Sequence, residues 1–187
     1  ADCDFQRLSR IYGQMADLFY KQKIMRNAID FWFKASKYSY KSGETLNYII
    51  FYEHTASAYY LMNKYDSALV ICKNSMNLFK EHGYIKESYD AMPTFIMILI
   101  KQDRLQEARS YIKDYETNSN LFNNNGDIQK GKELYYYIKG IYNLKLAELD
   151  SSVYYFRKLL DNANNYNRKE SAYEGLLKVY QEIGEND

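Results

Sequence analysis

The stretch ASAYYLMNKYDSALVICKNSM, residues 56–76, places narrow side chains at Ala56, at Ala68 twelve residues later and at Ser75 seven residues after that. The same spacing occurs forty residues earlier, at Ala16, Ala28 and Ala35. Two weaker copies follow, at Ile96, Ala108 and Tyr115 and at Gly140, Ser152 and Leu159. A period of this length indicates a chain built from similar structural units placed one after another.

Narrow residues at these positions predict pairs of closely packed helices, because two helices approach each other closely only where the side chains between them are small. The narrow residue midway along the first helix admits the second helix. The second helix then needs its own narrow residue near its start and another about two turns later. A larger side chain would overpack the contact, so we expect Ala28→Leu or Ala68→Leu to lower the free energy of unfolding by about 1–3 kcal/mol.

Apolar residues recur at helical spacing along almost the whole chain, and proline occurs once, at Pro93. Turn signals divide this pattern into about nine helices of roughly 15 to 20 residues. The signals lie at residues 21–23, 41–43, 63–64, 82–83, 102–103, 118–127, 148–150 and 162–167 and at Gly184. Gly43 and Gly83 follow helices, where a left-handed residue is favoured. The predicted fold class is all-α, a right-handed solenoid of antiparallel helix pairs.

Charge and hydropathy argue against two classes of partner. The chain carries 25 Lys and Arg against 24 Asp and Glu, without the basic surplus of a nucleic-acid-binding protein. Its longest apolar run, FIMILI at 95–100, is far shorter than the ~18 residues of a membrane span. We therefore expect neither nucleic-acid binding nor membrane insertion by this segment. The 22 tyrosines suit helix interfaces and binding surfaces equally well.

The helix pairs resemble the tetratricopeptide repeat family. The resemblance rests on the pattern A-DLFYKQKIMRNAIDFWFKA, residues 16–35, and on A-SAYYLMNKYDSALVICKNS, residues 56–75. It covers repeats at about 9–42, 49–82, 89–117 and 133–163 and a partial repeat at 170–187. The third repeat departs from the pattern at Ile96 and Tyr115, and Pro93 predicts a kink or a late helix start there. A period near 40 matches HEAT or armadillo repeats better than the family norm of 34, but the internal spacing favours the tetratricopeptide pattern.

The resemblance implies that the first helix of each pair lines a concave groove that binds a protein or peptide. Aromatic and aliphatic side chains would anchor the partner, and lysines would meet its carboxylates. Each of these residues could instead pack only against a neighbouring helix. The residues that the resemblance places in the groove are Asp17, Tyr20, Lys21, Glu53, Ser57, Tyr60, Leu61, Met97, Ile100, Lys101, Tyr137, Ile141, Leu144 and Lys145.

No catalytic, cofactor or metal site is predicted. The two histidines, His54 and His82, belong to no cluster with ligand spacing, and we expect His54 to be solvated or partly buried. Cys72 is expected to act as a small buried hydrophobic residue, and Cys3 lies in the N-terminal segment. The sequence contains no GxGxxG, phosphate-binding loop, HExxH or GxSxG motif.

The favoured function is a protein- or peptide-binding scaffold, the sensory or interaction segment of a longer bacterial signalling or regulatory protein. One alternative is a structural module that self-associates into a homo-oligomer through Leu176, Leu177 and Tyr180 of the partial repeat. A second alternative, an enzyme or a receptor for a small molecule or glycan, would need a deep enclosed pocket containing Glu53 and His54. Localisation stays open, and the resemblance to anchored sensor segments favours the periplasm over the cytoplasm.

Overall fold

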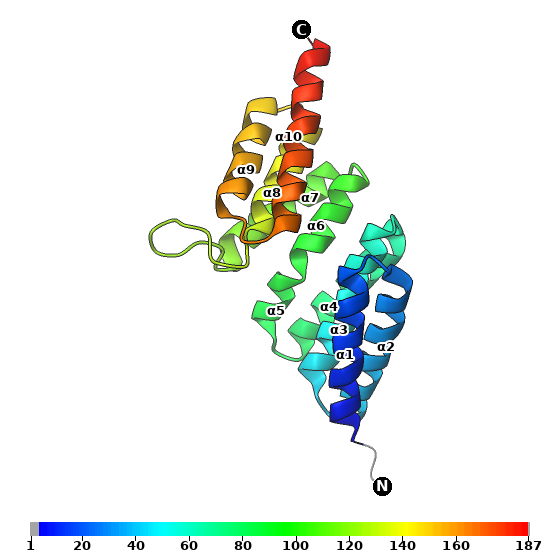
Figure 1. Ribbon diagram of the computed structural model, residues 1–187. Coiled ribbons are helices and arrows are strands. Elements are labelled where there is room, and N and C mark those ends of the chain that lie inside the picture. Colours follow the sequence, from blue (N-terminus) through cyan, green and yellow to red (C-terminus); the bar gives the residue numbers. More distant parts are fainter. Residues whose placement is uncertain (1–3, 187) are drawn as a thin grey trace. The chain divides into compact units, whose positions relative to one another are not determined.

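A computed structural model describes residues 4–186, with side chains through residue 184, and Cys3 lies outside this part. The described residues form ten helices and no β-strand, apart from one isolated β-bridge between Phe122 and Ile128, which confirms the all-α prediction (Figure 1). The chain divides into two compact units, unit 1 ending at Ile98 and unit 2 beginning at Leu99. The helices are α1 (Phe5–Lys21), α2 (Met25–Lys41), α3 (Thr45–Leu61), α4 (Tyr65–Glu81), α5 (Ile85–Asp90), α6 (Met92–Lys101), α7 (Leu105–Asn118), α8 (Leu134–Lys145), α9 (Leu149–Asn162) and α10 (Tyr166–Asn186).

The first four helices have 17 residues each and are joined by three-residue turns, which sets a period of 20 residues per helix. Each of these three turns contains one residue with positive φ, namely Lys23, Gly43 and Asn63, and the turns after α4 and α6 contain Gly83 and Asp103. At the first turn the Ile24 N–H donates to the Phe19 carbonyl oxygen at 2.9 Å, and the Lys23 N–H donates to the Tyr20 carbonyl oxygen at 3.0 Å. This is the Schellman arrangement, which satisfies the last carbonyl groups of a helix.

One expected helix is divided in two. The first helix of the third repeat is broken at Ala91, so that α5 and α6 stand where a single helix was expected. Pro93 is the second residue of α6. The N–H groups of the first helical turn have no acceptor within the helix, so a proline there costs no hydrogen bond. A kink or a late helix start was predicted from Pro93; the helix begins on time at Ile85 and is interrupted at Ala91, which is the first of these alternatives.

In unit 1, consecutive helices from α1 to α5 pack against each other. Ala16, Ala28, Ala56 and Ala68 are all fully buried, as their spacing predicted. Ala16 and Ala28 belong to one cluster with Trp32, which fills the space that the alanines leave. The narrow residues therefore set the close approach of the helices in this unit.

In unit 2, α8, α9 and α10 pack against one another around Phe156. This ring lies between two glycines, because a Cβ atom built on Gly140 or on Gly175 would stand 2.6 Å or 2.4 Å from it. The hydroxyl of Ser152 donates to the Gly140 carbonyl oxygen at 2.8 Å and joins α9 to α8. Narrow residues thus admit a large ring in this unit as well.

The third repeat departs from the pattern at both of its wide positions. Ile96 and Tyr115 are buried where narrow residues were expected. All residues from 91 to 100 are buried, as expected for a helix that is apolar on every side. The segment between α7 and α8 is held by the Lys132 ammonium, which donates to the Ser119 carbonyl oxygen at 2.6 Å.

Two turn predictions are wrong. The turn expected at residues 148–150 lies earlier, because Ala147 takes the positive φ and α9 begins at Leu149. Gly184 was expected to end a helix but lies inside α10, which continues to Asn186. A glycine permits a turn but does not impose one.

Candidate functional site

A cleft open to solvent, with a volume of about 260 Å³, lies in unit 1. We call it the unit 1 cleft. Its walls come from the C-terminal halves of α1 and α3 and from the middle of α2. The lining side chains are Asp17, Tyr20, Lys21, Trp32, His54 and Ser57.

The walls of the cleft are aromatic. The ring of Trp32 lies 5.2 Å from that of Tyr20 and 5.3 Å from that of His54, measured between centroids. The three rings are inclined to one another, at 49° for the first pair and 65° for the second. Trp32 is almost fully buried, so it forms the inner wall of the cleft. Such walls give a bound group a large apolar contact area.

Asp17 is fixed at the mouth of the cleft. The Trp32 Nε1–H donates to Asp17 Oδ1 at 3.0 Å, which holds the indole and the carboxylate in one arrangement. Lys21 lies one helical turn beyond Asp17 and is exposed. The mouth therefore carries one carboxylate held by a hydrogen bond and one exposed ammonium group.

His54 supplies a buried polar atom with no protein partner. Its Nδ1 is shielded from solvent and makes no hydrogen bond. Burial lowers the pKa of the imidazole, and the Asp17 carboxylate opposes that shift. The buried imidazole therefore contributes its ring to the wall of the cleft, while its Nδ1 stays inside the protein.

Glu53 precedes His54 on α3 and does not line the cleft, although the sequence predicted it as a groove residue. The carboxyl is partly buried, and burial together with the charge of Asp90 raises its pKa to about 8. Its charge in turn adds to the raised pKa of Tyr20, for which burial is the larger cause. Burial and Glu53 also raise the pKa of Cys72, a free and buried thiol as expected.

The structure brings four of the predicted groove residues together in the unit 1 cleft, namely Asp17, Tyr20, Lys21 and Ser57. Ser57 also lies 3.5 Å from the Thr94 hydroxyl. Tyr60 and Leu61 do not line it: the Tyr60 ring lies 5.7 Å from that of Tyr65, and Leu61 is exposed.

Two residues predicted from the third repeat are part of the core. Met97 and Ile100 are 7% and 1% exposed, because the whole of α6 before Lys101 is apolar and buried. They are therefore positioned for packing, which was the alternative interpretation of each groove residue.

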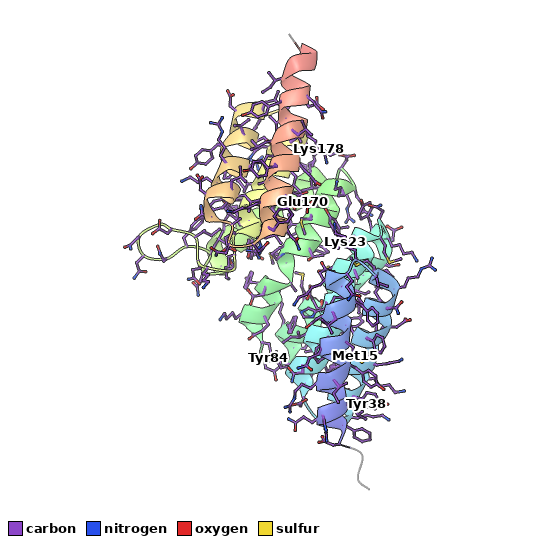
Figure 2. All side chains as sticks on the ribbon, in the orientation of Figure 1. Met15, Lys23, Tyr38, Tyr84, Glu170 and Lys178 are labelled. Atoms are coloured by element: carbon purple, nitrogen blue, oxygen red, sulfur yellow. The ribbon has the colours of Figure 1, made fainter. Side chains whose placement is uncertain are left out.

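The remaining predicted residues lie in unit 2. Tyr137, Ile141 and Leu144 are partly buried on α8, with the Tyr137 ring 6.0 Å from that of Phe156. Lys145 forms an ion pair with Asp103 at 2.7 Å. Burial, and then the charges of Lys178 and Lys145, lower the pKa of Lys101. Lys178 lies on α10 (Figure 2).

Sequence reasoning missed Trp32 and His54. Trp32 was not among the predicted groove residues, and most of its surface is buried. Its indole N–H donates to Asp17, and no spacing rule predicts that bond between residues fifteen positions apart. Two signals in the sequence could have pointed to the site. One is Trp32, the single tryptophan of the chain, and the other is the acidic residue Asp17 directly after the narrow residue Ala16.

Two searches of the described residues give negative findings. Between residues 4 and 186, no group of three or more His, Cys, Asp or Glu side chains is arranged to hold a metal ion. Within the same part of the chain, no helix combines the length and the apolar character that crossing a membrane requires.

Comparison with known proteins finds no match to this chain, either among family models or among curated proteins.

Proposed function

We propose that the chain is a binding protein that holds a segment of another polypeptide in the unit 1 cleft. The observation that carries this proposal is the open cleft with aromatic walls and a carboxylate held by a hydrogen bond. Its volume of about 260 Å³ falls below the roughly 300–1,000 Å³ of pockets for drug-sized ligands. A cleft of that size suits one anchoring side chain, and such anchors carry much of the affinity in protein interfaces.

The test is selection from a phage library of random linear peptides with immobilised protein. We expect the wild-type chain to enrich a consensus sequence. Ser57→Tyr fills the cleft and should abolish enrichment, whereas Ser67→Tyr, at an exposed position on α4, should retain it. Circular dichroism would verify that both variants are folded. Failure of the wild type to enrich any consensus, or equal enrichment by Ser57→Tyr, would reject the proposal.

We also propose that the helix pairs are tetratricopeptide repeats. Support comes from the first two repeats, in which Ala16, Ala28 and Ala35 and their counterparts Ala56, Ala68 and Ser75 are all fully buried. The repeat length of two 20-residue helix-and-turn units is longer than the family norm, and the third repeat departs from the pattern.

A second candidate function is self-association through α10. Of the three residues predicted for this contact, Leu177 and Tyr180 are 59% and 47% exposed, whereas Leu176 is partly buried. Tyr166 and Tyr173, which are 77% and 62% exposed, share one face of α10 with Leu177. Lys169 and Glu174 lie on the same face of α10, which Figure 2 marks by the labels of Glu170 and Lys178. Two copies in antiparallel contact could therefore pair each Lys169 with Glu174 of the other copy. The occupant of this face would be a second copy of the chain.

Sedimentation equilibrium tests this candidate. We expect a mass that rises with protein concentration for the wild type and the monomer mass for Leu177→Glu. A monomer mass for the wild type at all concentrations would exclude self-association through α10.

A further inference from the structure

We propose that the unit 1 cleft selects a basic side chain, arginine or lysine, of the polypeptide that it binds. This inference rests on the proposed function and adds the chemical class of the anchor. It depends on the kind of polar group that the cleft presents, on the orientation of its rings and on the position of its one cation.

The fixed charge of the cleft is negative. Asp17 accepts one hydrogen bond from a neutral donor, the Trp32 indole, and that bond orients the carboxylate without neutralising it. An ionised carboxylate has about four lone-pair sites, so acceptor capacity remains for donors on a ligand. Guanidinium and ammonium groups fill such sites with charge-assisted hydrogen bonds, which are about twice as strong as neutral ones.

The aromatic rings favour a cation for a separate reason. Ring faces carry negative electrostatic potential, and a cation within about 6 Å of a ring centroid is attracted to them. Tyr20 and Trp32 are tilted at 49°, and His54 meets the Trp32 ring at 65°, so the cleft is bordered by ring faces and edges in different directions. An arginine side chain can stack on such faces and still reach Asp17.

The remaining groups agree with this assignment. Burial lowers the pKa of the His54 imidazole and so favours its neutral form, which adds no positive charge to the cleft. Among the residues that the structure describes, Lys21 is the cationic side chain that lines the cleft, and it is exposed at the mouth. We expect its ammonium group to stay in water and to oppose the binding of a basic ligand weakly.

Trp32 provides the measurement, because it is the single tryptophan of the chain and lines the cleft. Its fluorescence would be followed during titration with N-acetyl-arginine amide and with N-acetyl-citrulline amide, a neutral molecule of the same shape. N-acetyl-glutamate amide serves as the anionic probe. We expect saturable binding of the arginine probe, at least about fivefold tighter than that of the citrulline probe, and no saturation with glutamate.

Two variants on one helical turn give the matched controls. Asp17→Asn keeps an oxygen that can accept from Trp32 but removes the charge, and it should abolish the preference for arginine over citrulline. Lys21→Gln should strengthen binding of the arginine probe, because it removes a like charge. Added salt should weaken the arginine preference of the wild type, since the mouth is exposed.

The inference is overturned if citrulline binds as tightly as arginine, or if Asp17→Asn leaves the preference unchanged. Peptide selection keeps this failure apart from failure of the proposed function. A consensus without a basic residue that is still lost in Ser57→Tyr rejects the basic anchor and leaves peptide binding in place. The absence of any consensus rejects peptide binding itself.

Discussion

Glu53 ties the stability of unit 1 to pH. Because burial raises the pKa of its carboxyl to about 8, the folded chain holds a proton that the unfolded chain releases between about pH 4.5 and 8. Stability contributed by this proton is present at the acidic end of that window and is lost as the pH rises through 8. We expect Glu53→Gln to stabilise the chain relative to wild type by up to about 4 kcal/mol more at pH 9 than at pH 5, measured by urea unfolding.

Glu81→Gln is the control for this substitution, since Glu81 is exposed at the end of α4. Its stability difference from wild type should not change between the two pH values. If Glu53→Gln gave the same difference at pH 5 and pH 9, the carboxyl would have to be ionised in the fold at both.

At the same scale, the sequence could predict the polar mouth of the cleft but not its inner wall. Asp17, Lys21 and Ser57 follow the narrow residues of their repeats, so position in the repeat was enough to find them. Trp32 and His54 depend on how three helices meet, and the ring contacts at 5.2 and 5.3 Å arise only in the folded unit. Met97 and Ile100 had equivalent repeat positions but lie in a helix without a polar face.

At the scale of the helix and its turn, the residue with positive φ decides local stability. Ala147 holds a φ of 57°, a conformation that is unfavourable by about 1 kcal/mol for a residue with a Cβ atom, whereas Gly83 adopts 79° freely. We expect Ala147→Gly to stabilise the chain by about 0.5–1 kcal/mol and Gly83→Ala to destabilise it by about 1 kcal/mol, as measured by thermal unfolding.

Gly184 supplies a control of opposite sign. It lies within α10 with no neighbouring atom near its ideal Cβ position, so Gly184→Ala should stabilise the helix by a few tenths of a kcal/mol. Destabilisation by Ala147→Gly would show that backbone strain at that turn is offset by some contact of the alanine methyl group.

The same turns show which helix boundaries a sequence can reveal. Gly43, Asn63 and Gly83 are residue types that tolerate the left-handed region, and the turns were predicted at these positions. Ala147 has no such preference, so the boundary near it was placed too late. The break between α5 and α6 followed from Pro93, whose ring restricts the chain before it.

At the scale of the whole molecule, most contacts between helices join helices that are consecutive in the sequence. In unit 1, α1 packs on α2, α2 on α3 and α3 on α4; in unit 2, α8, α9 and α10 form their own group. Repeat proteins with such contacts have stabilities that are sums of local terms, and a perturbation spreads only to neighbouring repeats.

Hydrogen exchange of backbone amides tests whether the two units respond separately. Ala28→Leu overpacks the cluster around Trp32 and should speed exchange in α1 to α3 while leaving α8 to α10 unchanged. Gly175→Ala is the matching change in unit 2. The new Cβ atom would meet the Phe156 ring, and that ring cannot move away because it also lies against Gly140. This substitution should speed exchange in α8 to α10 alone. If either substitution accelerated exchange equally in all of these helices, the chain would unfold as one cooperative unit, and local repeat contacts would not account for its stability.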